Sequence, residues 1–220
     1  MRAYDVLIVG AGVFGVTAAL ELRSRNYRVA LVDQDSVPNI RGASTDINRV
    51  VRIDYGSDSD YTTLAERSRT GWLRWNEELF EEDLYHEVGM VFLTRSPMAP
   101  GSYEYESYQS LSARGYPVER LDGVEIARRF PAWNEEVFVE GYFNPNDGYV
   151  ESGRVMEQLL AQARRQGVEI FERTGVAELL VTDGHIRGVR TIDGERFVAG
   201  EVVIAAGAWT PLLVPELQSM

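Results

Sequence analysis

The chain has 220 residues, a formal net charge of −12 and no cysteine. A chain of this length buries about 70% of its unfolded surface, which is enough for a core without metal or disulfide staples. The lack of cysteine excludes disulfides, zinc ribbons and thiol catalysis within this chain. All 22 basic residues are arginine, which also excludes a phosphate-loop lysine or a Schiff-base lysine. The acidic balance argues against nucleic acid as a partner, because a phosphate backbone needs clustered cations.

Membrane and targeting signals are weak in this sequence. An apolar run over residues 6–20 follows Arg2, but Asp5 precedes it, three glycines interrupt it and no small-residue cleavage site follows. No stretch reaches the roughly 18 apolar residues that span a bilayer. We therefore predict a soluble, cytoplasmic protein with no signal peptide and no membrane partner.

The N-terminal segment predicts a βαβ unit. The apolar run over 5–9 is typical of a strand buried on both faces of a parallel sheet. Apolar residues at helical spacing follow over about 12–25, and a second strand is predicted over 28–33. The three elements together have the length of a βαβ unit.

The middle of the chain is less regular. Residues 34–57 are polar and predicted to be irregular, and a long helix over 58–80 is expected to begin at a cap supplied by Asp58, Ser59 or Asp60. A strand broken at a glycine, a tyrosine-rich helix, a further strand and a dense turn are expected over 84–94, 103–114, 138–143 and 144–148.

The last third predicts one amphipathic helix and a β-meander. The helix is expected over 152–166, with Gly167 as its stop. Its predicted buried residues are Val155, Leu159, Leu160 and Ala163. A strand over 168–171 and three more strands follow, separated by Asp-Gly turns at 183–184 and 193–194, and the last ends in a buried run over 201–207.

These elements predict a mixed α/β fold with a Rossmann-like nucleotide-binding domain. We assign residues 1–83 and 151–220 to that domain, which includes the βαβ unit and the β-meander. Residues 84–150 are predicted to form part of a second, smaller α+β substrate lobe inserted into it. No composition shift marks a linker at either border.

A glycine motif supplies the first functional signal. Gly10, Gly12 and Gly15 fit the pattern G-x-G-x-x-G between a predicted strand and a predicted helix. The first permits a tight turn, the second lets a pyrophosphate approach the backbone, and the third brings helix against strand. Asp33 ends the second strand, where a carboxylate hydrogen-bonds a ribose hydroxyl and would repel a 2′-phosphate. We assign Val13, Phe14 and Gln34 to the same dinucleotide site, although NAD and FAD share this fingerprint.

Three stretches in order resemble one flavoenzyme family. They are the glycine motif, the stretch at 43–52 (ASTDINRVVR) and the ending at 205–209 (AAGAW), with residues 146–150 (NDGYV) between them. Together they resemble the FAD-dependent D-amino-acid oxidase superfamily. Within it they are most similar to the branch of monomeric sarcosine oxidase and the fructosyl-amino-acid oxidases, or amadoriases. The resemblance runs along essentially the whole chain.

The resemblance implies FAD as the cofactor and a set of site residues. Arg49 matches a basic position near the flavin ring, where a cation stabilises arriving electron density. Arg52 matches the arginine that holds a substrate carboxylate, for which a bidentate donor is well suited. The other positions implied to lie beside the cofactor are Ser44, Thr45, Val176, Ala205, Ala206, Gly207 and Trp209.

The residues themselves leave plainer interpretations open. An arginine in a polar loop is often only solvated, and Arg49 and Arg52 could pair with Asp46 or Asp54. Trp209 after a buried strand could be an ordinary core aromatic. Of the two histidines, His86 falls in a predicted strand and His185 in a hairpin turn, so both are expected to be structural or exposed. No spacing of His, Asp and Glu predicts a metal site.

The length departs from the family pattern, because the resembling enzymes are about twice as long. The chain resembles their N-terminal half, so we expect a fragment, a half-length gene product or one part of a split protein. A complementing C-terminal half is then a possible partner.

The predicted function is FAD-dependent oxidation of a secondary amine of an amino acid. The substrate would be sarcosine-like or a fructosyl or other N-alkyl amino acid, oxidised to an imine while oxygen is reduced to hydrogen peroxide. A flavin dehydrogenase, or an oxidase for another amine such as saccharopine or pipecolate, is the first alternative. A truncated, non-catalytic nucleotide-binding chain is the second.

Overall fold

The computed structural model describes residues 2–133 and 136–219. The chain forms two compact units: unit 1 consists of Met1–Ile47 and Ser152–Met220, and unit 2 of Asn48–Glu151. This border lies earlier than the predicted one at residue 83, because residues 48–83 pack within unit 2. The assignment of the units to cofactor and substrate stays a prediction.

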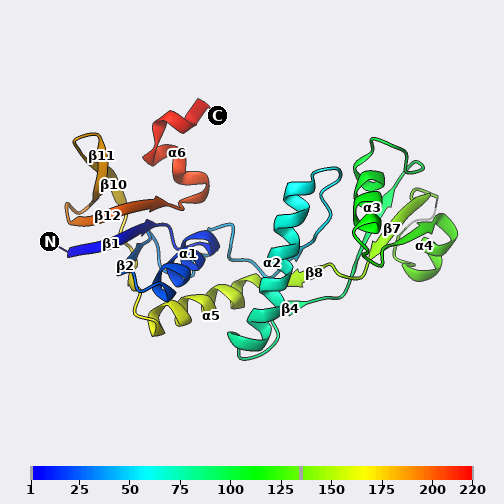
Figure 1. Cartoon of the computed structure of the whole chain (residues 1–220), viewed down its shortest axis with the longest axis horizontal. Helices are drawn as coiled ribbons and strands as arrows, with labels where there is room; N and C mark the ends of the chain where they lie inside the picture. Colours follow the sequence, from blue (N-terminus) through cyan, green and yellow to red (C-terminus); the bar gives the residue numbers. More distant parts are fainter. Residues whose placement is uncertain (1, 134–135, 220) are drawn as a thin grey trace. The chain divides into compact units, whose positions relative to one another are not determined.

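Unit 1 is built on a six-stranded mixed sheet with the order β10-β11-β12-β1-β2-β9 (Figure 1). The four strands β12, β1, β2 and β9 run parallel, while β10, β11 and β12 form the antiparallel meander. The bounds are β1 (Arg2–Val9), β2 (Val29–Val32), β9 (Glu169–Phe171), β10 (Val176–Thr182), β11 (His185–Thr191) and β12 (Arg196–Ile204).

The apolar strand runs form the centre of this sheet. Leu7 of β1 lies opposite Val202 of β12 on one side and Ala30 of β2 on the other. Leu7 and Ile8, which point to opposite faces, are both fully buried. The predicted parallel-sheet strand and the meander are therefore confirmed.

Helices α1 (Val13–Ser24) and α5 (Ser152–Arg165) pack against each other beside the sheet (Figure 1). All four apolar residues predicted to be buried in α5 are buried, which confirms that prediction. Helix α1 buries Gly15, Val16 and Ala19, while Phe14 is 82% exposed. After β12 the chain forms the 3-10 turn η1 (Gly207–Trp209), the short helix α6 (Thr210–Leu213) and the 3-10 turn η2 (Pro215–Ser219).

The described residues of unit 2 form two small antiparallel sheets and three helices. One sheet has the order β3-β8-β4 and the other β5-β7-β6. The strands are β3 (Arg49–Val51), β4 (Tyr85–His86), β5 (Met90–Thr94), β6 (Glu119–Asp122), β7 (Glu140–Asn144) and β8 (Gly148–Val150). The helices are α2 (Ser59–Glu78), α3 (Tyr103–Ala113) and α4 (Gly123–Arg129).

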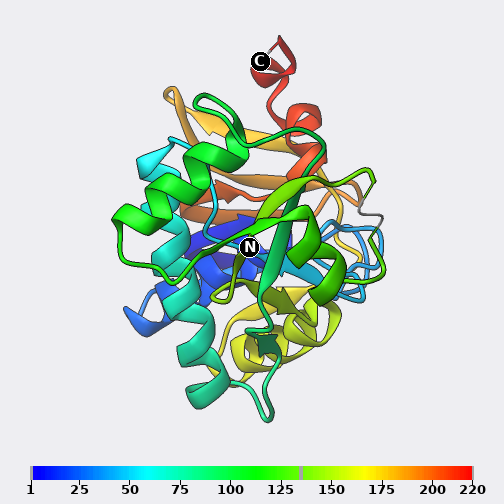
Figure 2. The same cartoon turned by 90° about the vertical axis from the view of Figure 1, so that its right-hand side faces the viewer.

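Helix α2 begins as the sequence predicts, because the Asp58 side chain accepts the Tyr61 N–H at 2.9 Å. The end of α3 lies beside the first turns of α2 (Figure 2), where Arg114 donates to Glu66 at 2.9 Å and to Ser59 Oγ at 2.8 Å. The prediction that residues 34–57 are irregular is wrong at β3, a strand that forms because it pairs with β8. The elements β6 and α4 were not predicted, since the polar segment that forms them has no clear apolar period.

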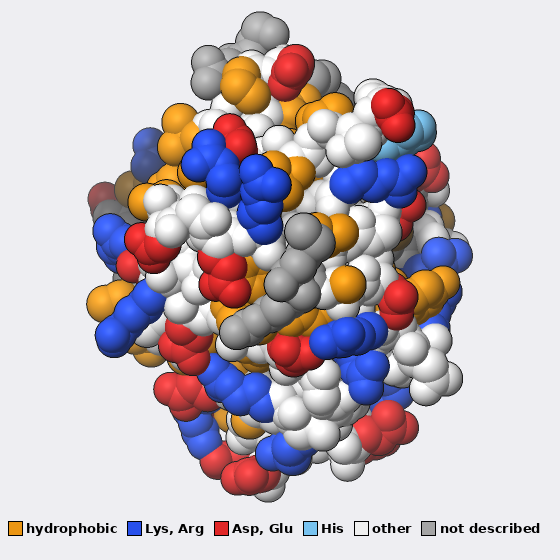
Figure 3. All heavy atoms as spheres, turned by 90° about the vertical axis from the view of Figure 1, so that its left-hand side faces the viewer, with side chains coloured by type: hydrophobic (Ala, Val, Ile, Leu, Met, Phe, Trp, Pro, Cys, Tyr) orange, Lys and Arg blue, Asp and Glu red, His pale blue; other side chains and the backbone are white. Residues whose placement is uncertain are grey.

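Acidic and basic side chains are interspersed over the face seen in Figure 3. Two of the ion pairs on unit 1 are Arg190–Glu178 at 2.7 Å and Arg28–Glu169 at 3.4 Å. Both are solvent-exposed, and such pairs contribute little stability. No helix in the described part of the chain combines the length and apolar character needed to cross a bilayer.

Candidate functional site

The glycine loop between β1 and α1 is shaped by close backbone approach. Gly10 has φ +107°, and a Cβ there would lie 2.4 Å from the Ala205 carbonyl oxygen. A Cβ on Gly15 would lie 1.9 Å from the Gly10 carbonyl oxygen. Neither position can accept a side chain without moving the main chain, so both need glycine. The main chains of the loop, the end of β12 and the start of α1 therefore lie close together, with no side chain between them.

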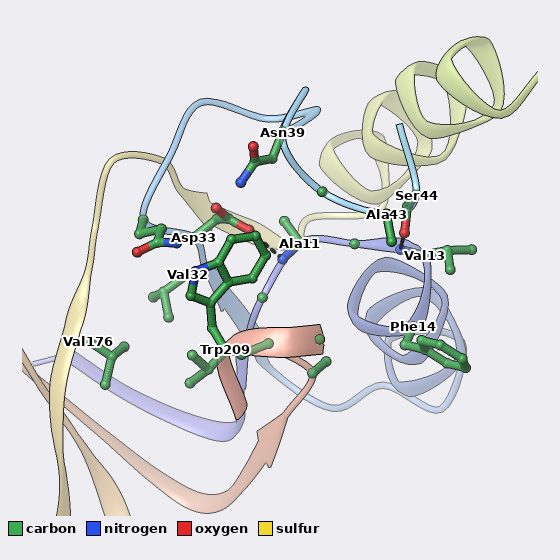
Figure 4. Close-up of a pocket in the computed structure, with 18 of the residues that line it drawn as sticks. Ala11, Val13, Phe14, Val32, Asp33, Asn39, Ala43, Ser44, Val176 and Trp209 are labelled. Atoms are coloured by element: carbon green, nitrogen blue, oxygen red, sulfur yellow. Dashed lines mark hydrogen bonds between the residues drawn. The ribbon is translucent and has the colours of Figure 1, made fainter. Parts of the chain in front are cut away.

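The N-terminus of α1 opens toward this loop. Its first turn carries no acidic side chain, and its Val13 N–H donates to Ser44 Oγ at 3.0 Å (Figure 4). Free amides and the helix dipole at such an end favour a negatively charged group. Ser44, which the resemblance implies to lie beside the pyrophosphate or flavin, thus contacts the N-terminus of α1.

Asp33 anchors the opposite side of the loop. Its Oδ2 accepts the Ala11 N–H at 2.8 Å and its Oδ1 accepts the Asp35 N–H at 3.0 Å. The side chain is almost fully buried but borders the cavity, as Figure 4 shows. Each carboxylate oxygen has a further lone pair, so this side chain can still accept hydrogen bonds from ribose hydroxyls.

These elements enclose a cavity of about 240 Å³ in unit 1. The Trp209 ring lies across it, on the side of Asp33 (Figure 4). The structure brings together in its lining the predicted residues Gly10, Gly12, Val13, Phe14, Asp33, Gln34, Ser44, Thr45, Val176, Ala205, Ala206, Gly207 and Trp209. Gly15 packs behind the loop instead, and Arg49 belongs to unit 2.

Sequence reasoning missed several lining residues, among them Asn39, Thr174, Leu212 and Leu213. Thr174 reaches the site because its N–H donates to the Asp33 carbonyl at 2.7 Å. No local signal could have found it, since the parallel pairing of β2 with β9 brings the two strand ends together. Leu212 and Leu213 belong to α6, a short helix that the sequence analysis did not include.

The cavity fits the adenosine and pyrophosphate part of a dinucleotide. Its glycine loop carries no side chains that would occupy the space beside the backbone, and its helix end favours anions. The Asp33 carboxylate can accept hydrogen bonds from hydroxyl groups. The residues that would hold FAD are therefore present in unit 1.

Arg52 is the better defined of the two predicted arginines in unit 2. Its Nη1 donates to the Asp54 main-chain carbonyl at 2.7 Å and to the Tyr103 hydroxyl. The guanidinium carbon lies 5.0 Å from the Tyr55 ring centre and 5.6 Å from that of Tyr103. Among the residues that the structure describes, no hydrogen bond of Arg52 uses Nε or Nη2. That edge can take a carboxylate with two parallel hydrogen bonds.

Arg49 begins β3, opposite Val150 of β8, and is exposed. The interpretation of Arg52 as paired with the Asp54 carboxylate is not what the structure has, because the bond goes to the main-chain carbonyl. The carboxylate of Asp54 instead points into unit 2.

A buried polar network surrounds the Asp54 carboxylate. Its Oδ1 accepts the Tyr142 hydroxyl at 2.6 Å and its Oδ2 accepts the Asn144 amide at 3.1 Å. Asp147 lies beside it, and the Asp147 Oδ1 accepts the Ile53 N–H at 3.0 Å. Asp54, Tyr142, Asn144 and Asp147 are all fully buried.

Burial and the adjacent acid alter proton binding in this network. Burial first, and then the hydrogen bond with Asp54 and its charge, raise the pKa of Asp147 to about 9. Burial also raises the pKa of Tyr142 far above that of a free phenol, so its hydroxyl stays a neutral donor. The sequence analysis did not identify the pair of acids, which are distant in the chain.

The two histidines occupy different settings. His86 Nε2 lies 2.9 Å from Glu151 Oε1, and its ring lies 4.8 Å from that of Tyr149. His185 is exposed at the start of β11. Within residues 2–133 and 136–219, no group of three or more His, Asp or Glu side chains could hold a metal ion.

Comparison with known proteins agrees with this fold. The family model described as FAD dependent oxidoreductase (DAO) matches residues 5–220. The chain is 25% identical to the monomeric sarcosine oxidase of Bacillus sp. (strain B-0618) over 97% of its length, and 26% identical to the N-methyl-L-tryptophan oxidase of Yersinia pestis (strain Pestoides F), also over 97%. It matches the crystal structure of glycine oxidase from Geobacillus kaustophilus with a TM-score of 0.84 and 29% identity, covering 98% of this chain and 58% of that one.

The chain therefore belongs to the DAO family of FAD dependent oxidoreductases. The predicted fold class and the predicted resemblance are confirmed, and so is FAD as the family's cofactor. The chain spans about half the length of the curated relatives it matches, 54% of the sarcosine oxidase and 56% of the N-methyl-L-tryptophan oxidase.

Proposed function

We propose that this chain supplies the FAD-binding part of an oxidase for a secondary amine of an amino acid. The observation that carries the proposal is the unit 1 cavity, with its glycine loop, helix end and Asp33. Family membership supports FAD, and two relatives are named for sarcosine and N-methyl-L-tryptophan, both N-methyl amino acids. The chemistry that FAD would supply when bound is a two-electron acceptor: a hydride equivalent would leave the C–H bond beside nitrogen and a proton the N–H group, giving an imine, and the two electrons with two protons would then reduce oxygen to hydrogen peroxide.

The chain's own residues would bind and orient the cofactor. The α1 amides and Ser44 would contact the pyrophosphate, while Asp33 would accept a hydrogen bond from the ribose. Val176, Thr45 and the segment Ala205–Trp209 would exclude water from the nucleotide through their place in the cavity lining.

The arginines of unit 2 would act on the substrate side. Arg52 would hold the substrate carboxylate through its Nε and Nη2 edge, while Tyr55 and Tyr103 keep the guanidinium plane in place. Arg49 would place a permanent positive charge near the flavin ring. Both roles rest on the positions these residues share with the resembling family.

A nucleotide-binding chain without activity of its own is the second candidate. The observation that favours it is the match to about half of each curated relative. A complementing C-terminal half would then supply the remaining substrate contacts. A flavin dehydrogenase would share the same cavity and differ only in its reaction with oxygen.

Reconstitution with FAD separates these candidates. The purified chain is mixed with FAD, desalted, and its visible spectrum recorded, with Gly10→Ala as the variant that forces the glycine loop away from the Ala205 main chain in the cavity wall and Gly71→Ala as the control in unit 2. Sarcosine is then added without oxygen, followed by air and a peroxide assay. Bleaching by sarcosine and recolouring with peroxide would support an oxidase, whereas bleaching without recolouring would indicate a dehydrogenase. A flavin that is bound but not reduced by any secondary amine would support the second candidate.

A further inference from the structure

The buried acids Asp54 and Asp147 of unit 2 are not used by the proposed cofactor site. Both are fully buried, yet no donor among the described residues reaches one oxygen, Asp147 Oδ2. Two ionised carboxylates are acceptors only and repel each other, so this arrangement is costly unless one of them carries a proton. A proton on Asp147 Oδ2 would convert the orphaned oxygen into a donor toward Asp54.

The donor sets assign the proton to one member of the pair. Asp54 accepts the Tyr142 hydroxyl and the Asn144 amide, two donors that stabilise a negative charge. Asp147 accepts only the Ile53 N–H in the described part of the chain. The charge therefore belongs on Asp54 and the proton on Asp147, in agreement with the raised pKa of Asp147.

The pair is connected directly to Arg52. The Arg52 Nη1 and the Tyr103 hydroxyl both donate to the main-chain carbonyl of Asp54. The side chain of the same residue accepts hydrogen bonds from Tyr142 and Asn144 and lies beside Asp147, so a change in the buried pair acts on the residue whose carbonyl Arg52 contacts.

We propose that Asp54 and Asp147 share a single proton, carried by Asp147, and that this pair is the positioning element that holds Arg52. The proton sharing stands on its own, whereas the use of Arg52 for a substrate carboxylate rests on the proposed function. Loss of the proton puts two charges side by side in a buried site, which displaces the Asp54 carbonyl and with it the guanidinium.

The other titratable groups around the pair do not compete for this proton. Arg52 is permanently charged, and its charge lowers the pKa of Asp147, but by less than burial raises it. Tyr85 from β4 and Tyr142 from β7 have raised pKa values because both are buried, so they remain neutral. Tyr103 from α3 contacts the Asp54 carbonyl rather than the carboxylates.

The test follows aspartate carboxyl carbons by NMR in the whole 220-residue chain, labelled with carbon-13 at aspartate. We expect one carboxyl signal of a protonated acid at pH 7, where an ordinary aspartic acid, with a pKa of about 3.9, is ionised. That signal should vanish in Asp147→Asn and persist in Asp60→Asn, an exposed control in the same unit. Ionisation of every aspartate by pH 6 would overturn the proposal. So would a protonated signal that disappears in Asp54→Asn but remains in Asp147→Asn.

Tyr142→Phe supplies a second variant if Asp147→Asn fails to fold. It keeps both acids but removes one donor from Asp54, so the elevated carboxyl titration should shift to still higher pH. An unchanged midpoint would contradict a proton shared with Asp54.

The positioning role has its own signal, the Arg52 Nε–H resonance, assigned with Arg52→Lys. We expect this resonance to move with the same midpoint as the protonated carboxyl, and to lose its pH dependence in Asp147→Asn. A resonance that ignores the carboxyl titration would overturn the positioning role. Sarcosine is then added stepwise at pH 7. If the acid pair titrates as expected but sarcosine does not shift the Arg52 Nε–H resonance, the result would count against the proposed function alone.

Discussion

The two units bury carboxyl groups in opposite ways. In unit 1, the carboxylate of Asp33 accepts two main-chain N–H groups, from Ala11 and Asp35. In unit 2, Asp54 and Asp147 lie beside each other, and one oxygen of Asp147 has no donor in the described structure. The difference teaches that burial alone does not decide the charge of an acid, because the donors and the neighbouring charges that it meets also shift its pKa.

The contrast extends to the construction of the two interiors. Unit 1 has a core of apolar strands, and its glycine loop leaves its backbone open to the cavity. Unit 2 surrounds its buried acids with hydroxyl and amide groups from Tyr142, Asn144 and Ser107. A buried polar interior of this kind is sensitive to the loss of any one hydrogen-bond partner.

The largest effect is expected at the glycine loop, where unit 1 has no space. Gly15→Ala puts a Cβ 1.9 Å from the Gly10 carbonyl, so it should lower the free energy of unfolding of unit 1 by about 3 kcal/mol. In unit 2, a Cβ on Gly71 meets nothing within 4 Å, and Gly71→Ala should raise stability by about 0.5–1 kcal/mol because alanine favours the helix. Urea unfolding of both variants measures this, and equal effects would break the contrast between the units.

The next prediction makes the same chemical change in both units. Asp33→Asn replaces one acceptor oxygen by a donor, which leaves a main-chain N–H unpaired and should cost about 1–3 kcal/mol. Asp147→Asn replaces a protonated acid by an amide of similar shape, so it should change the free energy of unfolding little at pH 5. Chemical denaturation between pH 5 and pH 8 compares them.

The pH dependence has a defined sign for Asp147. Its pKa is raised on folding, so the stability it contributes is present below its unfolded pKa and is lost as the pH rises toward the folded value. The Asp147→Asn variant lacks this loss. Its free energy of unfolding should therefore rise relative to that of the wild type as the pH rises, by up to about 1.4 kcal/mol per pH unit. Asp35→Asn, which removes a partly exposed partner of Arg41, serves as control, and a parallel pH dependence of the wild type and both variants would refute the assignment.

The smallest effect concerns an exposed acid of unit 2. Asp58→Ala removes the side-chain acceptor of the Tyr61 N–H at the start of α2 and should cost about 1 kcal/mol. Asp60→Ala removes a charge from the same first turn without removing a cap, so its cost should stay within about 0.5 kcal/mol. Thermal unfolding followed by circular dichroism compares the two. Equal losses would show that charge, and not the cap, matters here.

The first part of unit 1 is readable from the sequence because its signals are local. The strand, the glycine motif, α1 and Asp33 lie in a single continuous segment, and each glycine has one steric reason to be there. The buried face of α5 follows from its spacing alone. The exposure of Phe14 could not be read in this way, since only the assembled cavity shows which side of α1 is left open.

The interior of unit 2 could not be predicted for the opposite reason. Asp54 follows the short strand β3, and Asp147 lies in the turn between β7 and β8, so only the pairing of β3 with β8 brings them together. A three-residue segment such as 49–51 is too short to carry a periodic pattern, and it forms a strand because β8 pairs with it. The role of Arg52 likewise depends on Tyr103 from a distant helix.

The order of the chain has a consequence for its synthesis. Unit 2 lies between the two segments of unit 1, and β1 takes its place beside β12, with Leu7 opposite Val202. A ribosome therefore releases an apolar strand long before its partner exists, while all of unit 2 has already emerged and can fold. Until β12 arrives, β1 offers a bare edge of the kind that recruits other chains. Arrest of translation or cleavage of the nascent chain within residues 152–195 should therefore leave a folded unit 2 attached to β1, a strand that is then prone to aggregate.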